Sequence, residues 1–194
     1  MNIKGYDIEF LEDDHIYLVD GVILPSITQI LKVKFGGKYE GVNQSVLKRA
    51  SELGTLVHKE IEDFEKYGIE GDTKELRNYK FLKNLHGFNC LGNELPLILF
   101  RNDKPVACGT TDLLLSEGDK IGLGDIKRTS ALDKEYLSYQ LNLYRLAYIQ
   151  SYEKPIEFLR GLHLREDIRK YIEIPINEEI AWELLEQYER SNNG

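Results

Sequence analysis

The sequence predicts an α/β fold in which strands and helices are mixed along the chain. Apolar runs of strand length, bounded by turn residues, alternate with segments whose apolar residues recur every three or four positions. The chain has 194 residues, enough to bury a sizeable core, and it shows neither an internal repeat nor a low-complexity linker. We therefore expect one domain over residues 1–194, with an N-terminal strand and helix extension at about residues 1–40.

The N-terminal extension is predicted to contain short strands followed by a helix. Residues 6–24 alternate loosely between apolar and polar, with turn residues at Glu12–Asp14 and Asp20–Gly21. Ser26 can cap the helix that follows, and Gln29 three residues later completes a capping box. A pair of glycines after Phe35 would end this helix.

The clearest helix is predicted at Gln44–Tyr67. Its apolar residues recur at helical spacing and form one stripe that should face the core: Leu47, Ala50, Gly54, Val57, Ile61 and Phe64. Because glycine is costly inside a helix, Gly54 suggests that another part of the structure approaches closely there. His58 lies beside the stripe, and Glu62 follows one turn later and can face the same way.

The rest of the chain alternates between strand and helix patterns. Turn residues separate the middle strands, at 102–105 and at 117–119. Strands are expected at Leu95–Phe100, Gly109–Leu115, Ile121–Lys127, Ile156–Leu164 and Lys170–Ile176, and helices at about Thr73–Leu85, Lys134–Ser151 and Glu178–Arg190.

The composition excludes several classes of protein. No apolar run reaches membrane-spanning length, and the N-terminal residues lack the apolar core of a signal peptide, so we expect a cytoplasmic protein without a membrane partner. Cys90 and Cys108 have no C-x-x-C spacing, which excludes a disulfide scaffold and a cysteine-bound zinc or iron–sulfur site. The net charge of −8 argues mildly against binding nucleic acid by bulk electrostatics, although a bound cation would reverse the sign locally.

Two short segments predict a divalent-metal site. Asp112 lies on one expected strand, and Asp125 and Lys127 lie on the next, two residues apart and therefore on one face. A hairpin centred on the turn at 117–119 would place Asp112 opposite Gly124 and beside Asp125. Two carboxylates at that separation repel each other, and a shared cation is the usual remedy. The alternative is an ordinary Asp–Lys surface pair.

Three further polar residues could belong to this site. A histidine beside an apolar stripe is more often structural, but as a ligand His58 would favour manganese over magnesium. Gln140 and Tyr144 lie one turn apart on an apolar helix face, where a glutamine needs a hydrogen-bond partner. That partner could be the backbone, Lys127 or a substrate phosphate.

Taken in order, these motifs resemble those of the PD-(D/E)XK nuclease superfamily. They are Gly54-Thr55-x-x-His58, Gly109-x-x-Asp112, Asp125-Ile126-Lys127 and Gln140-x-x-x-Tyr144. The set is most similar to the RecB-like branch, which includes CRISPR-associated adaptation nucleases and phage and mitochondrial exonucleases. His15-x-Tyr17 followed by Pro25-Ser26-Ile27-Thr28 is similar to the phage and mitochondrial type. Thr111 stands where the superfamily has its eponymous proline, and the two cysteines cannot build the iron–sulfur cluster of many relatives.

The resemblance implies a restriction-endonuclease-like core with a central mixed β-sheet flanked by helices. It implies a DNA exonuclease that uses Mg²⁺ or Mn²⁺, held by the side chains of His58, Asp112 and Asp125 and by the Ile126 carbonyl. Lys127 would orient or activate the attacking water and stabilise charge on the phosphate. In the same reading Gln140 and Tyr144 would support Lys127 and the DNA backbone, and Glu94 is either the family's early acidic residue or an ordinary turn glutamate.

The expected partners are single-stranded or duplex DNA ends, with a helicase or a single-strand annealing protein as a possible further partner, in a bacterial or phage-infected cell. Two alternatives belong to other classes of function. One is a catalytically inert nucleic-acid-binding module that keeps the nuclease fold, and the other is a protein-interaction module of a recombination or defence system. Retention of the full Asp–Asp–Lys set favours the enzyme over both.

Overall fold

The computed structural model describes residues 2–11, 16–37 and 43–192, so His15 and the turn predicted at 12–14 lie outside the described residues. The helices are α1 (Ile27–Phe35), α2 (Gln44–Tyr67), α3 (Lys74–His86), α4 (Lys134–Tyr152) and α5 (Glu178–Asn192). The strands are β1 (Asn2–Ile3), β2 (Tyr6–Leu11), β3 (Ile16–Val19), β4 (Val22–Leu24), β5 (Asn89–Arg101), β6 (Lys104–Glu117), β7 (Lys120–Lys127), β8 (Phe158–Leu164) and β9 (Arg169–Ile174). None of the described helices has the length and apolar content that crossing a membrane would need.

The centre of the fold is a mixed sheet with strand order β5-β6-β7-β8-β9, which confirms the predicted α/β class. β5, β6 and β7 form an antiparallel meander, because each turn between them is short. β7 and β8 are parallel, and α4 supplies the long connection that a parallel pair requires. β9 then returns antiparallel to β8.

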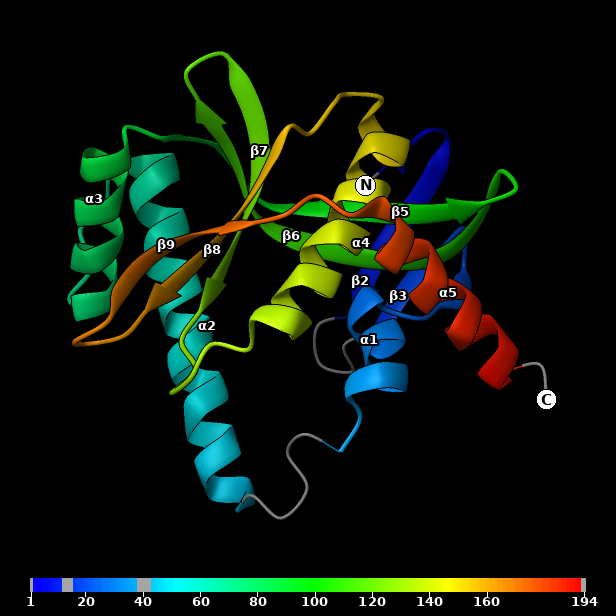
Figure 1. Cartoon of the computed structure of the whole chain (residues 1–194), viewed down its shortest axis with the longest axis horizontal. Helices are drawn as coiled ribbons and strands as arrows, with labels where there is room; N and C mark the ends of the chain where they lie inside the picture. Colours follow the sequence, from blue (N-terminus) through cyan, green and yellow to red (C-terminus); the bar gives the residue numbers. More distant parts are fainter. Residues whose placement is uncertain (1, 12–15, 38–42, 193–194) are drawn as a thin grey trace.

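Helices cover both faces of this sheet (Figure 1). α1, α4 and α5 pack on one face around a cluster of buried side chains that includes Leu97, Leu123 and Leu141. α2 and α3 pack on the other face around a second cluster, which includes Ile61 and Tyr79. The sheet is therefore buried on both sides, which explains why its middle strands read as nearly continuous apolar runs.

The N-terminal extension forms a separate antiparallel sheet with strand order β1-β2-β3-β4. It packs against β5 and β6 through a third cluster of buried residues, which includes Tyr17, Ile98 and Cys108. The chain then reaches α1, whose capping box of Ser26 and Gln29 is present as predicted. Beside this cap the Cys108 N–H donates to the Pro25 carbonyl at 3.0 Å, so the extension is hydrogen-bonded to the middle of β6.

Two strands are longer than their sequence patterns predict. β5 has 13 residues and β6 has 14, whereas the apolar runs indicated six and seven. Gly92 lies outside the predicted strand but inside β5, because the register shifts between Cys90 and Gly92 and pairing with β6 continues on both sides of the shift. The added length matters because it brings Glu94 into the sheet.

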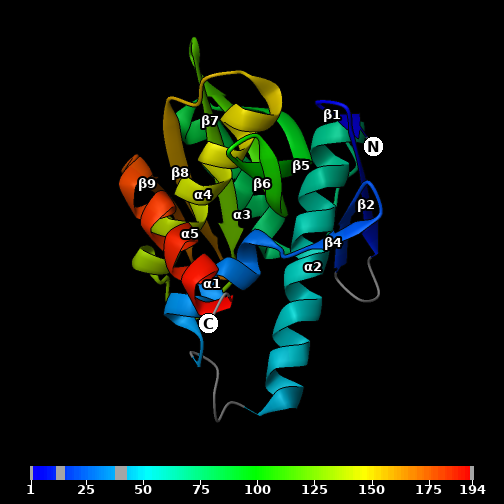
Figure 2. The same cartoon turned by 90° about the vertical axis from the view of Figure 1, so that its right-hand side faces the viewer.

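α2 has the predicted ends, but its predicted core stripe is wrong in the first half. Val57 and Ile61 are buried, whereas Ala50 is exposed and Leu47 is only partly covered. A Cβ built at Gly54 meets no described atom within 4 Å, so the close approach expected there is absent from the described residues. Figure 2 shows the reason: the first half of α2 extends beyond the central sheet and the helices that cover it.

Candidate metal centre

The register of the β6–β7 hairpin differs from the predicted one by a single residue. Leu113 pairs with Gly124 and Glu117 with Lys120, so the turn is Gly118-Asp119, and continuing this register by one residue places Asp112 opposite Asp125, not Gly124. A one-residue change in register moves a side chain to the other face of a strand. The observed register therefore places both aspartates on the same face, which the predicted one would not have done.

A third carboxylate comes from β5. Glu94 lies between Asn93, which pairs with Leu113, and Leu95, which pairs with Thr111, so it stands beside Asp112. Its backbone is left-handed, with φ of 50°. This conformation is unfavourable for a glutamate and recurs at functional sites, where the surrounding structure holds it in place. Three adjacent strands thus each contribute one carboxylate to one region of the sheet.

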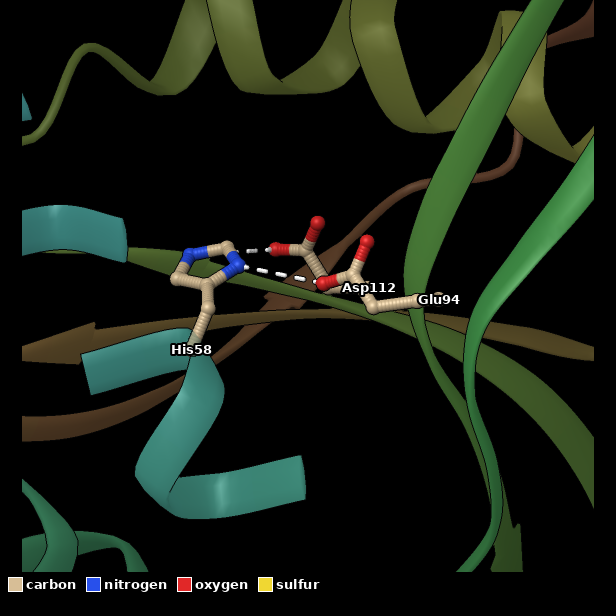
Figure 3. A group of neighbouring side chains, drawn as sticks. All are labelled: His58, Glu94 and Asp112. Atoms are coloured by element: carbon tan, nitrogen blue, oxygen red, sulfur yellow. Dashed lines mark hydrogen bonds and ion pairs between the residues drawn. The ribbon is translucent and has the colours of Figure 1, made fainter. Parts of the chain in front are cut away.

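His58 approaches these carboxylates from α2, as Figure 3 shows. Its Nδ1 lies 3.4 Å from Glu94 Oε1, and its Nε2 lies 3.7 Å from Asp112 Oδ2. The ligand atoms of His58, Glu94 and Asp112 all lie within 4.8 Å of one another, a spacing that one cation could bridge. Glu62 is not part of this group and forms ion pairs with Lys66 and Lys59.

The charge state of His58 shows how strongly negative this position is. Burial by itself would lower the pKa of the imidazole, but the carboxylates of Asp112, Glu94 and Asp125 outweigh it and raise the pKa to about 9. The imidazolium at neutral pH thus sits where a divalent cation would neutralise the same carboxylates. One nitrogen and several carboxylate oxygens form a ligand set suited to manganese or magnesium, so these residues fit such an ion.

Backbone groups of Ile126 complete the region around Asp112. The Ile126 N–H donates to Asp112 Oδ2 at 2.7 Å, which fixes the orientation of that carboxylate. The Ile126 carbonyl lies 3.3 Å from His58 Nε2, so it also faces the group. Three of the predicted ligands therefore lie together: His58, Asp112 and the Ile126 carbonyl. Glu94 is a fourth member of this group.

Asp125 is placed differently from the other predicted ligands. It is 1% exposed, and its Oδ2 forms an ion pair with Lys127 Nζ at 2.6 Å. Burial raises the pKa of Asp125 to about 6, against the opposing effect of the Lys127 ammonium. Burial also disfavours the charged lysine, but Asp125 and Asp112 more than compensate and raise the pKa of Lys127. Lys127 is therefore protonated at neutral pH.

Gln140 and Tyr144 lie together on the buried face of α4. Gln140 Nε2 donates to the Tyr144 hydroxyl at 3.2 Å, and Gln140 Oε1 has no hydrogen-bond partner among the described residues. Gln140 makes no hydrogen bond to Lys127 within those residues either. Burial, with Asp112 and Asp125 nearby, raises the pKa of Tyr144 well above its usual range, so its hydroxyl stays neutral.

Gly109 explains how Tyr144 reaches the site. A Cβ at this position would lie 3.1 Å from Tyr144 Cε1 and 3.1 Å from Ile27 Cδ1. Any larger residue would push the tyrosine ring or α1 away from β6. The glycine three residues before Asp112 thus has a packing role that its sequence pattern alone did not reveal.

The sequence did not predict a contact between Tyr17 and Thr110 near the site. Tyr17, from the N-terminal sheet, forms a hydrogen bond at 3.0 Å with the Thr110 hydroxyl, next to the Asp112 strand segment. Burial raises the pKa of Tyr17, and the carboxylate of Glu94 acts in the same direction. No local pattern could have paired residues so far apart in sequence; only the resemblance drew attention to Tyr17.

No known family model matches this chain, and no curated protein matches it. Among solved structures, one titled "Crystal structure of SSO0001" is similar with a TM-score of 0.48 and 16% sequence identity, over 85% of this chain and 74% of that chain. A likeness of this degree says nothing about what this chain does.

Proposed function

We propose that this protein is a divalent-metal-dependent nuclease that hydrolyses phosphodiester bonds in DNA, acting as an exonuclease at DNA ends. The observation that carries the proposal is the grouping of His58, Glu94 and Asp112 within 4.8 Å, beside a buried Asp125–Lys127 pair. Asp125 is 1% exposed and the Asp112 side chain 12% exposed, and holding these two carboxylates together out of water is costly unless a cation or a reaction requires them. The resemblance of the motifs to PD-(D/E)XK nucleases supports the same chemistry.

The metal ligands in this proposal are the side chains of His58, Glu94 and Asp112 and the carbonyl of Ile126. Asp125 lies near His58 and Asp112 and adds its charge to the same site. A divalent ion held by these residues would supply Lewis acidity for the scissile phosphate and for a water molecule. Asp112 is already oriented by the Ile126 N–H, so one ligand is preorganised before the ion binds.

Lys127 has an electrostatic role in this proposal. In the metal-free protein the carboxylates of Asp125 and Asp112 raise the pKa of Lys127, so we assign it the role of a fixed positive charge. It can hold a water molecule by donating a hydrogen bond and stabilise the charge that develops on the phosphate oxygens. Asp125 keeps the ammonium in place through the 2.6 Å ion pair.

The test is cleavage of end-labelled linear DNA and of closed circles, both single- and double-stranded, with Mn²⁺, Mg²⁺ or EDTA. Asp125→Asn keeps the side chain's size but removes its charge, and we expect it to lower the cleavage rate by at least about a hundredfold. Asp119→Asn, an exposed change in the turn of the same hairpin, is the matched control and should keep full activity.

Digestion of linear but not circular DNA, lost with EDTA and with Asp125→Asn, would establish a metal-dependent exonuclease. Cutting of circles would show an endonuclease. An unaffected Asp125→Asn protein would contradict the proposed site. If no DNA is cut with any metal, the protein is better explained as an inert binding or interaction module, and salt-sensitive DNA binding would then separate the first from the second.

A further inference from the structure

The end of β7 that carries Lys127 lies beyond the part of the strand that is paired on both sides. The β6–β7 ladder ends at Gly124, whereas the β7–β8 ladder continues to the pair Lys127–His163. Among the described strands, residues 125–127 are therefore paired with β8 alone, apart from the Ile126 N–H bond given above. The position of Lys127, the last residue of β7, thus depends on its neighbour in β8.

His163 holds the chain at two points around this strand end. It pairs with Lys127 in the parallel ladder, and its Nε2 lies 2.7 Å from the Thr129 carbonyl oxygen. A carbonyl can only accept, so Nε2 carries the hydrogen and donates it. Because His163 is only 3% exposed, water does not compete for this bond. One residue of β8 therefore positions the backbone both at Lys127 and two residues later.

A second contact acts on the same segment but constrains its backbone less. Arg128 Nε donates to Glu75 Oε1 at 2.7 Å, and Glu75, on α3, is 3% exposed. The guanidinium is joined to the backbone by a long and flexible side chain, so the backbone can move while this pair stays intact. The bond from His163 is made to the backbone itself. The direction of the chain after Lys127 therefore depends mainly on His163.

The other ring nitrogen of His163 shows which substitution isolates this bond. His163 Nδ1 is buried and has no hydrogen-bond partner within the residues that the structure describes. The amide nitrogen of a glutamine can take the place of Nε2 and donate to the same carbonyl, and it loses no bond of Nδ1. Leucine fills a similar volume but cannot donate. Comparing glutamine with leucine at this position therefore separates the hydrogen bond from the filling of space.

Building on the proposed nuclease function, we propose that His163 is a positioning residue for Lys127. By donating to the Thr129 carbonyl it holds the end of β7, so that the Lys127 ammonium stays beside Asp125, where it stabilises charge on the phosphate. Small displacements of such a group are costly to the chemical step. Loss of the bond therefore lowers kcat and leaves KM nearly unchanged.

The test is single-turnover cleavage of labelled linear DNA with Mn²⁺ by His163→Leu, His163→Gln and Lys127→Met proteins. We expect His163→Leu to lower the maximal rate by about tenfold to a hundredfold, with the half-saturating DNA concentration changed by less than about twofold. His163→Gln should keep the rate within about threefold of the unaltered protein. Added to Lys127→Met, His163→Leu should have no further effect, because the group through which it acts is already gone.

Ile174→Val is the matched control for a loss of stability. Ile174 is 4% exposed and pairs with Leu159 at the other end of β8, so shortening its side chain weakens the same sheet away from Lys127. The control should cleave within about twofold of the unaltered rate. The inference is overturned if His163→Gln is as slow as His163→Leu, or if His163→Leu has the same effect with and without Lys127.

Hydrogen exchange in the metal-free protein, without DNA, distinguishes failure of this inference from failure of the nuclease proposal. Amides of residues 125–132 should exchange at least about tenfold faster in His163→Leu and at the unaltered rate in His163→Gln. If no metal supports cleavage but exchange differs in this way, His163 positions the segment and the nuclease proposal is wrong. If DNA is cut but His163→Leu changes neither rate nor exchange, the nuclease function stands and the role given to His163 is wrong.

Discussion

In the proposed metal site, the protonated state of His58 would make the affinity for the ion depend on pH by an amount that can be calculated. A metal ion needs the lone pair of an imidazole nitrogen, so binding at neutral pH must first displace the proton. With a pKa of about 9 in the metal-free protein, that displacement costs about 1.4 kcal/mol for each unit below 9. At pH 7 the penalty is about 2.7 kcal/mol, equivalent to about a hundredfold in affinity.

The affinity for Mn²⁺ is expected to increase with pH. The apparent affinity for Mn²⁺ should rise about tenfold for each pH unit between 7 and 9 and then level off, because the proton is gone above the pKa. Below about pH 6, Asp125 also becomes protonated, which should weaken binding further. The histidine proton opposes the metal at neutral pH, whereas the aspartate proton opposes it only in acid.

Titration calorimetry in two buffers of different ionisation enthalpy measures the affinity for Mn²⁺ and the number of protons released on binding. Near neutral pH, binding of one Mn²⁺ should release about one proton. His58→Gln should bind more weakly at high pH, with no proton release and a flat profile between pH 7 and 9. His86→Gln, which changes an exposed histidine on α3, should keep the slope. Affinity that does not vary with pH, with no proton released, would refute the assignment of His58 as a ligand.

Three further predictions test other parts of the site. Glu94→Gln removes the β5 carboxylate and should weaken Mn²⁺ binding by at least about tenfold in the same calorimeter, whereas unchanged affinity would place Glu94 outside the ligand set. Gly109→Ala must displace Tyr144 or α1 by a few tenths of an ångström, and urea denaturation should show a loss of about 1–3 kcal/mol; an unaltered unfolding free energy would mean that the neighbours yield freely. Tyr17→Phe removes only the hydroxyl that bonds Thr110 and should cost about 0.5–1.5 kcal/mol by the same measurement, and a more stable variant would contradict the role given to that bond.

Local patterns predicted most elements because their signals are local. The capping box at Ser26 and the ends of α2 depend on residues within a few positions of one another, and both match the structure. The lengths of β5 and β6 did not follow from pattern, since the residues beyond each apolar run, such as Gly92, are held in the sheet by pairing with the neighbouring strand. The exposure of the first half of α2 could not be predicted from its apolar pattern either, because it depends on where the sheet ends.

The order of the motifs predicted which residues form the candidate site, but it did not predict how their side chains lie relative to one another. The sequence placed an aspartate on each of two neighbouring strands, with Lys127 two residues after Asp125. Only the two-residue turn at Gly118-Asp119 decided that Asp112 and Asp125 share a face. Turn length is set by how the whole sheet pairs, so a register one residue away remained equally compatible with the local pattern.

The sequence by itself thus determined the α/β class, the helices and the chemical types of residue available to the site. The tertiary structure decided that Glu94 joins His58 and Asp112, that Lys127 is held charged by Asp125, and that His163 bonds the chain just after it. The reason is physical. Helix caps and periodicities act over a few residues, whereas electrostatic coupling and long-range hydrogen bonds arise between groups that the fold alone brings together.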